Sequence, residues 1–346
     1  MNRIVPLALS AISTAGLCLS AAAAPAAPAK PAAIAGFSFV KSLAGIDEYR
    51  LDANDLTVLL VPDHSAPVVT FMVTYRVGSR NEVSGTTGAT HLLEHLMFKG
   101  SKNYNNEKGN SVEQYLERVG GNYNANTSLD RTAYYAQIGS ESLEGYIAID
   151  ADRMRNLMLR ESDRSTEMTV VRNEFEIGEN DPVQSLDKEI FAASYIAHPY
   201  HHPVIGWRSD IENVSIEKLR AFYDTYYWPN NATVTVVGDF QTENALALIR
   251  KYYGEIPRAP AAIPVPYTAE PAQTGPRFTF KPSDPALVRS KPVVIAVNGR
   301  DPRGRAFSRE WSVTRASKRA AIVAEPTSPG RCSYRCTTRP ITLTQC

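Results

Sequence analysis

The stretch GATHLLEHLMF, residues 88–98, places two histidines four residues apart, with a glutamate directly before the second. In an α-helix, positions four apart lie on one face, so His91 and His95 can bind the same ion. Two neutral imidazoles and one further carboxylate leave zinc an open position for water. Glu94 projects toward the same side and is placed to take a proton from that water. The stretch therefore predicts a zinc-dependent hydrolytic site on a helix.

The remaining residues of this stretch are mostly apolar, which predicts a buried helix. The apolar side chains are Leu92, Leu93, Leu96, Met97 and Phe98. Buried His and Glu side chains need a partner, and a metal ion supplies one. The alternative, two solvated histidines on a polar helix face, does not account for these neighbours. A chance match to H-x-x-E-H is expected in about one chain in a hundred of this length.

A third protein ligand is required, and a helix expected at residues 163–179 offers two candidates. Glu167 and Glu174 are seven residues apart, which is two helical turns, and they share one stripe of that helix. Glu176 and Glu179 lie off this stripe. Spacing alone leaves both Glu174 and Glu167 open as the ligand, beside the alternative of a solvated acidic face.

The pattern of apolar residues along the chain predicts an α+β fold. Strands are expected at residues 48–52, 56–62, 68–77, 123–128, 132–138 and 231–237. Helices are expected at residues 88–98, 110–119, 142–159, 163–179, 183–197, 215–227 and 242–253. This order predicts an antiparallel-rich sheet packed with helices, in one domain spanning residues 37–258.

The segments on either side of this domain differ from it in composition. Residues 1–24 combine an early arginine, an apolar run and small residues, which is typical of a secretory signal peptide, and residues 25–36 form an Ala/Pro spacer. Residues 259–281 are a Pro-rich linker. Residues 282–346 hold 12 Lys and Arg against 4 Asp and Glu, with little periodicity, and are predicted to be a disordered tail.

Charge and cysteine usage restrict the class of partner and the compartment. The net charge is +1, which gives no indication of a nucleic-acid partner. The signal peptide predicts a periplasmic or secreted protein, with no membrane span after signal cleavage. No cysteine occurs between Cys18 and Cys332, and an exported protein without core disulfides suits a periplasm.

The motif and several further segments resemble the pitrilysin/insulinase family of inverted-motif zinc metallopeptidases. Besides residues 91–95, the segments that carry the resemblance are Phe98-Lys99-Gly100, Gly120-Gly121, Asn124-Ala125, Thr127, Thr132-Ala133-Tyr134, Glu167, Asn173-Glu174, His198-Pro199-Tyr200, Pro203-Val204-Ile205-Gly206, Phe222-Tyr223, Tyr227 and Pro229-Asn230-Asn231-Ala232. The match runs over residues 46–258. It is most similar to the bacterial branch related to the β subunit of the mitochondrial processing peptidase.

The resemblance implies the roles of the residues around the motif. It implies one zinc ion per chain, bound by His91, His95 and Glu174. It implies that Glu94 is the general base, and that Glu167 is a second catalytic carboxylate, which orients a metal ligand.

The resemblance also implies a substrate class. Asn124 and Ala125 are expected on an edge strand that binds the substrate as an added strand. Recognition of this kind contacts the peptide backbone, so the expected substrates are extended or unfolded peptides. We therefore predict an exported endopeptidase that hydrolyses such peptides with a metal-activated water.

The resemblance finally implies a partner. Two related domains are expected, and the second, which lacks the metal motif, completes the chamber. No repeat of the fold is recognisable after residue 258. The predicted partner is therefore a homologous metal-free domain or subunit, and the alternative function is a truncated, non-catalytic half-domain that binds zinc and peptides without turnover. The composition after Lys281 fits out-of-frame translation, and the alternative is a natural basic tail.

Overall fold

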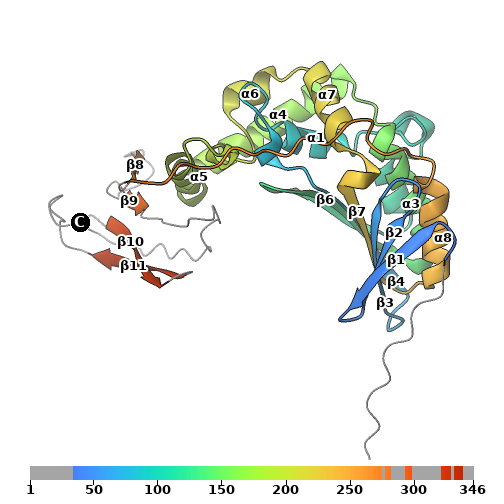
Figure 1. Cartoon of the computed structure of the whole chain (residues 1–346). Coiled ribbons are helices and arrows are strands. Elements are labelled where there is room, and N and C mark those ends of the chain that lie inside the picture. Colours follow the sequence, from blue (N-terminus) through green and yellow to red (C-terminus); the bar gives the residue numbers. More distant parts are fainter. Residues whose placement is uncertain (1–33, 275–276, 282–292, 298–320, 329–330, 338–346) are drawn as a thin grey trace, which may run out of the picture. The chain divides into compact units, whose positions relative to one another are not determined.

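The computed structural model describes residues 34–274, 277–281, 293–297, 321–328 and 331–337, and Figure 1 shows its elements along the chain. The predicted signal peptide and most of the predicted spacer lie outside the described residues. Among the residues described, no helix combines the length and the apolar character that crossing a membrane would require.

Seven strands form the central sheet, in the order β1-β2-β3-β7-β4-β6-β5. Their bounds are β1 Phe37–Leu43, β2 Ile46–Leu51, β3 Thr57–Pro62, β4 Val68–Tyr75, β5 Asn122–Thr127, β6 Thr132–Gly139 and β7 Ala232–Gly238. The pair β3–β7 is parallel and the other neighbours are antiparallel. The prediction of an antiparallel-rich α+β domain is confirmed. Strand β5 ends the order, so one of its edges is left unpaired within the described residues.

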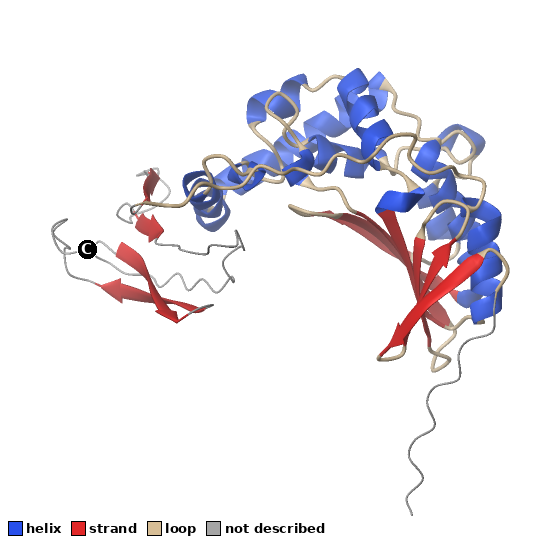
Figure 2. Ribbon diagram, viewed as in Figure 1, coloured by secondary structure: helices blue, strands red, loops and turns tan. Residues whose placement is uncertain are grey.

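Eight α-helices and five short 3-10 helices are described in this domain, and the α-helices other than α5 lie on one side of the sheet (Figure 2). The α-helices are α1 Ala89–Leu96, α2 Val112–Arg118, α3 Leu143–Arg155, α4 Glu161–Asn180, α5 Pro182–Ser194, α6 Arg208–Asn213, α7 Ile216–Tyr226 and α8 Thr242–Tyr253. The 3-10 helices are η1 Ser79–Asn81, η2 Asn106–Lys108, η3 Ser140–Ser142, η4 Pro199–His201 and η5 Pro229–Asn231.

The core lies between this face of the sheet and the helices. Side chains along β4 alternate between buried and partly exposed, as successive residues of a strand point to opposite faces. Phe71 on the buried face of β4 packs edge-on against Tyr146 of α3, with ring centroids 5.7 Å apart.

Two elements of this domain, apart from the short 3-10 helices, were not predicted from the sequence. Strand β1 alternates in sequence only over Phe37–Phe39, and it is mostly exposed beyond Phe37, so the apolar signal is too short to reveal it. It is stabilised as a strand by its antiparallel pairing with β2. Helix α6 has six residues and a single buried side chain, Ile211, which is too short a segment for helical periodicity to be recognised.

The described part of the C-terminal region forms a second sheet, in the order β11-β10-β9-β8. Its strands are β8 Arg277–Lys281, β9 Val293–Val297, β10 Ala321–Ser328 and β11 Arg331–Thr337. A disordered tail was expected at residues 282–346, but β9, β10 and β11 lie within that range. The remaining residues of the range lie outside the described ones. Strand β9 is a run of β-branched and apolar residues, which favours a strand. Strands β10 and β11 pair through backbone groups, whose hydrogen bonds do not require apolar side chains.

Candidate metal centre

Helix α1 begins at a position that only glycine can occupy. Gly88 has φ 85°, in the left-handed region, and a Cβ there would lie 2.4 Å from the carbonyl oxygen of Ile205. The apolar face of α1 is fully buried, with Leu92, Leu93 and Leu96 at 0–1% exposure. The helix is therefore held by packing on one face, and its histidines lie on the other.

A buried carboxyl group holds the first turn of α1. Glu82 accepts hydrogen bonds from the backbone N–H groups of Gly88 and Thr90, each at 2.8 Å. These are among the first N–H groups of a helix, which lack partners within it. Burial raises the pKa of Glu82 to about 8, although the two N–H bonds act in the other direction. A protonated carboxyl still offers lone pairs to both N–H groups, so this anchor persists at neutral pH.

His91, His95 and Glu174 converge between α1 and α4. The Nε2 atoms of His91 and His95 lie 3.6 and 3.8 Å from Oε2 of Glu174. One potential ligand atom from each residue lies within 4.8 Å of the other two. Around a tetrahedral zinc ion with ligands at about 2.0–2.1 Å, donor atoms are about 3.4 Å apart. Small shifts of these side chains therefore bring them to zinc coordination distances.

The surroundings of the two imidazoles suit metal binding. Burial, and secondarily the nearby His95, lowers the pKa of His91 to about 4, so His91 is neutral at neutral pH. Glu167 Oε2 lies 3.0 Å from Nδ1 of His95, and Glu167 Oε1 lies 2.8 Å from Nζ of Lys99. A proton held on Nδ1 by this carboxylate leaves the Nε2 lone pair of His95 directed toward Glu174.

The same contacts distinguish the two glutamates that helical spacing left open. Glu174 faces the Nε2 atoms of both histidines, whereas Glu167 contacts the opposite nitrogen of His95. Burial alone would raise the pKa of Glu167, but hydrogen bonds from Lys99 and His95 outweigh it and lower the pKa. Glu167 is therefore an ionised group that orients an imidazole, and Glu174 is the carboxylate placed for a metal.

Glu94 is buried at the same site and is held by a residue from the edge strand. The hydroxyl of Thr127 donates a hydrogen bond to Oε2 of Glu94. Burial raises the pKa of Glu94, and the Thr127 hydrogen bond opposes that rise. A carboxylate with a raised pKa accepts a proton more readily near neutral pH. Glu94 lines a cavity of about 340 Å³ together with His91, His95 and Glu174.

The edge strand borders this cavity as well. Asn124 is exposed, Ala125 is half-buried, and both line the cavity. The side-chain oxygen of Asn124 accepts a hydrogen bond from the N–H of Ala125 at 2.8 Å. This N–H is therefore bonded to the side chain of the preceding residue.

The sequence reasoning missed three supporting contacts at this site. Glu82 lies in a Gly/Ser/Thr-rich loop with no spacing that links it to α1. Thr127 and Lys99 entered only through the family resemblance, without a role. Each of these residues acts through a tertiary contact, and no periodicity in one sequence reports such a contact.

Comparison with known proteins relates this geometry to a family. Residues 57–207 match the model described as insulinase (peptidase family M16), and residues 213–302 match the model described as peptidase M16 inactive domain. The chain carries domains of the M16 (insulinase/pitrilysin) peptidase family. The resemblance inferred from the sequence is confirmed. The second M16 match extends to residue 302, past residue 258, after which the sequence showed no recognisable repeat of the fold, and past Lys281, where the composition changes.

M16 relatives extend the comparison to whole proteins. The chain is 37% identical over 227 residues to the zinc protease PqqE of Helicobacter pylori, covering 65% of this chain and 50% of that protein. It is 29% identical over 203 residues to a probable mitochondrial-processing peptidase subunit beta of Schizosaccharomyces pombe, covering 59% and 44%. The crystal structure of a protease from Helicobacter pylori aligns with a TM-score of 0.64 at 36% identity, covering 68% of this chain and 56% of that one.

These comparisons support a peptidase family with zinc as the metal. The chain spans about half the length of the curated relatives it matches. The donor set found here, two imidazoles and a carboxylate, is one that catalytic zinc sites use.

Proposed function

We propose that this chain is the metal-bearing part of a zinc endopeptidase that hydrolyses extended or unfolded peptides. One zinc ion per chain would be held by His91, His95 and Glu174. The observation that carries the proposal is the convergence of both Nε2 atoms on the Glu174 carboxylate, at 3.6 and 3.8 Å. The zinc proteases among the relatives support the choice of metal.

Glu94, Thr127 and Glu167 have separate roles in the proposed hydrolysis. Zinc, when bound, polarises a peptide carbonyl and lowers the pKa of a water molecule. Glu94 takes a proton from the attacking water and delivers it to the leaving amine nitrogen. Thr127 holds the Glu94 carboxylate in position, and Glu167 holds the ring of His95.

The unpaired edge of β5 is where we expect the peptide substrate to bind. A peptide added beside β5 places its backbone along Asn124 and Ala125, which line the metal cavity. Recognition through backbone hydrogen bonds selects an extended conformation and tolerates many side chains. Folded proteins do not present such a strand, so unfolded or unstructured peptides are the expected substrates.

We also propose that a homologous metal-free domain or subunit closes over this site. The Glu174 side chain is 43% exposed, which leaves the metal cavity open to water on the side of α4. The same exposure favours a second candidate function, a half-domain that binds zinc and peptides without turnover. The signal-like residues 1–24 support export, so we propose a periplasmic or secreted location.

The test uses the full chain with stoichiometric zinc and an unstructured peptide, with and without a chelator. The account predicts one zinc ion per chain and cleavage that the chelator abolishes and Glu94→Gln removes. Zinc binding without cleavage, unrestored by a metal-free homologous subunit, would establish the non-catalytic candidate. Failure to bind zinc would contradict both.

A further inference from the structure

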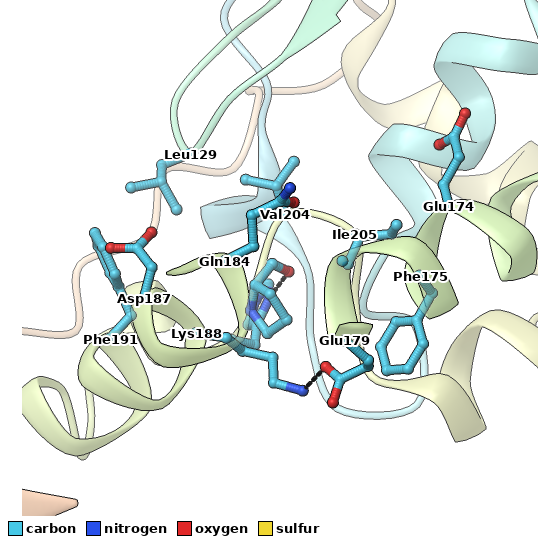
Figure 3. A pocket seen from close by; sticks show the side chains of 13 residues that line it. Leu129, Glu174, Phe175, Glu179, Gln184, Asp187, Lys188, Phe191, Val204 and Ile205 are labelled. Atoms are coloured by element: carbon cyan, nitrogen blue, oxygen red, sulfur yellow. Dashed lines mark hydrogen bonds and ion pairs between the residues drawn. The ribbon is translucent and has the colours of Figure 1, made fainter. Parts of the chain in front are cut away.

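The strand that carries Thr127 has little packing of its own. Strand β5 ends the sheet order, and all six of its residues are exposed or only partly buried. The tip of the β5–β6 hairpin borders a cavity of about 300 Å³, which Leu129 lines together with Asp187 and Phe191 of α5 (Figure 3). Close-packed neighbours are therefore missing on that side of the tip. Burial alone does not fix the end of β5.

The loop that follows β4 holds the hairpin tip through its backbone. The N–H of Ser79 donates to the carbonyl oxygen of Ser128 at 3.1 Å. The N–H of Arg80 donates to the carbonyl oxygen of Leu129 at 2.9 Å. Gly78 permits this approach, because a Cβ there would lie 2.4 Å from the carbonyl oxygen of Ser128. The loop and the tip are therefore in direct backbone contact.

Three side chains add a polar clamp to this backbone contact. A guanidinium nitrogen of Arg80 lies 3.1 Å from Oδ1 of Asp130, and the hydroxyl of Tyr200 lies 2.7 and 2.8 Å from the two Asp130 oxygens. The Asp130 side chain is 51% exposed, so the ion pair alone contributes little. Burial and the Asp130 hydrogen bond raise the pKa of Tyr200 to about 12, so its hydroxyl stays protonated and donates to a charged acceptor. We call Arg80, Asp130 and Tyr200 the Asp130 clamp.

The same loop also reaches the helix that carries the metal motif. Glu82 follows Arg80 by two residues and accepts hydrogen bonds from the first turn of α1. The loop therefore contacts the hairpin tip with one residue and α1 with another. The hydrogen bond from Thr127 to Glu94 joins these two elements, so it depends on the distance that the loop sets between them.

We propose that the Asp130 clamp keeps the end of β5 in place, so that Thr127 stays bonded to Glu94 and the strand edge stays aligned with the metal cavity. The proposal rests on the proposed peptidase function. The members of the clamp are positioning residues, since none of them lines the metal cavity. Loss of the clamp should lower kcat through Glu94 and raise KM through the displaced edge of β5.

Tyr200→Phe tests the clamp with the smallest change. It removes one hydroxyl and keeps the ring, which packs edge-on against His198 with centroids 4.3 Å apart. Tyr267→Phe makes the same change at a tyrosine that is 96% exposed, and it is the matched control. Asp130→Asn is a second variant, which keeps an oxygen for the Tyr200 hydroxyl and removes the charge that faces Arg80.

The first measurement is amide hydrogen exchange of the full zinc-loaded chain, with zinc content determined in the same samples. In Tyr200→Phe the β5 amides that pair with β6 should exchange about tenfold faster, because a hydrogen bond to a charged group is lost. Asp130→Asn should act in the same direction. Exchange in α8 and the zinc content should not change. Exchange in β5 equal to that of Tyr267→Phe, or an equal acceleration in α8, would overturn the proposal.

The second measurement is peptide cleavage by the chain in its active assembly. Tyr200→Phe should lower kcat about 3–10-fold and raise KM. Thr127→Val removes the hydroxyl that bonds Glu94, so in that background Tyr200→Phe should raise KM and leave kcat unchanged. Independent losses in kcat would overturn the proposal. A zinc-loaded wild-type chain that cleaves no peptide would contradict the endopeptidase function, and hydrogen exchange would then decide whether the clamp fixes β5.

Discussion

Helices α1 and α4 both supply proposed metal ligands, but they are supported very differently. Six of the eight residues of α1 are buried, whereas only Glu167 and Val171 are buried among the twenty residues of α4. The side chains of His91 and His95 are 18% exposed, and that of Glu174 is 43% exposed. Two ligands are therefore fixed before metal binding, and the third lies on a more exposed helix. The difference indicates that α1 determines the position of the site and α4 completes it.

The largest expected effect concerns Glu94, the residue of α1 that we propose as the general base. Glu94→Gln keeps the shape of the buried side chain and removes its ability to accept a proton. We expect unchanged zinc content and a loss of hydrolysis of about 10²–10⁴-fold. The measurements are metal analysis and peptide cleavage by the chain in its active assembly. Retained cleavage would remove Glu94 as the base.

The next effect compares two glutamates of α4. Glu174→Gln removes a charged ligand, whereas Glu167→Gln weakens only the support of His95. The loss of zinc affinity should be about 10–100-fold for Glu167→Gln and larger for Glu174→Gln, as measured by competition with a chromophoric chelator. If Glu167→Gln were the more damaging change, the ligand would have been assigned to the wrong turn of α4.

A smaller effect is expected at the anchor of α1. Glu82→Ala leaves the N–H groups of Gly88 and Thr90 without their acceptor and opens a cavity. The free energy of unfolding should fall by about 2–5 kcal/mol. Denaturant unfolding of the metal-free chain measures this loss, with Glu255→Ala at an exposed position as control. A loss equal to that of the control would mean that α1 does not depend on Glu82.

The last prediction concerns the pH dependence that Glu82 contributes. Its pKa is raised from 4.5 to about 8 in the folded chain, so the folded state binds the proton more tightly than the unfolded state. The stabilisation from this group is complete below about pH 4.5 and is lost as the pH rises through about 8. Glu82→Gln, which resembles the protonated form, should flatten the decline in melting temperature over this range. An unchanged pH profile in the variant would contradict the raised pKa.

The parts of the molecule that were predicted from sequence share a local signal. The spacing of His91, Glu94 and His95 within one helix, and the seven-residue interval between Glu167 and Glu174, are both readable in single segments. The runs of β-branched and apolar residues at β3, β4 and β7 likewise predicted strands. Helical geometry and strand geometry fix these patterns without knowledge of the rest of the chain.

The parts that were not predicted depend on contacts between distant segments. Glu82 meets the start of α1 only because the loop before it folds back, and Thr127 meets Glu94 only because β5 lies at the sheet edge. Spacing did not decide between Glu174 and Glu167, because both lie on the same helical stripe. Glu167 lies near Nδ1 of His95, whereas Glu174 lies near Nε2. This difference distinguishes the two glutamates, and it is visible only in the folded chain.

The central claim is that two imidazole nitrogens from α1 and one carboxylate from α4 share a zinc ion. X-ray absorption spectroscopy of the zinc-loaded full chain tests it most directly. The account predicts nitrogen and oxygen neighbours at about 2.0–2.1 Å, with outer-shell scattering from two imidazole rings. In Glu174→Gln the two imidazoles should remain while the metal is held more weakly. A spectrum with sulfur neighbours, or with no imidazole scattering, would contradict the account.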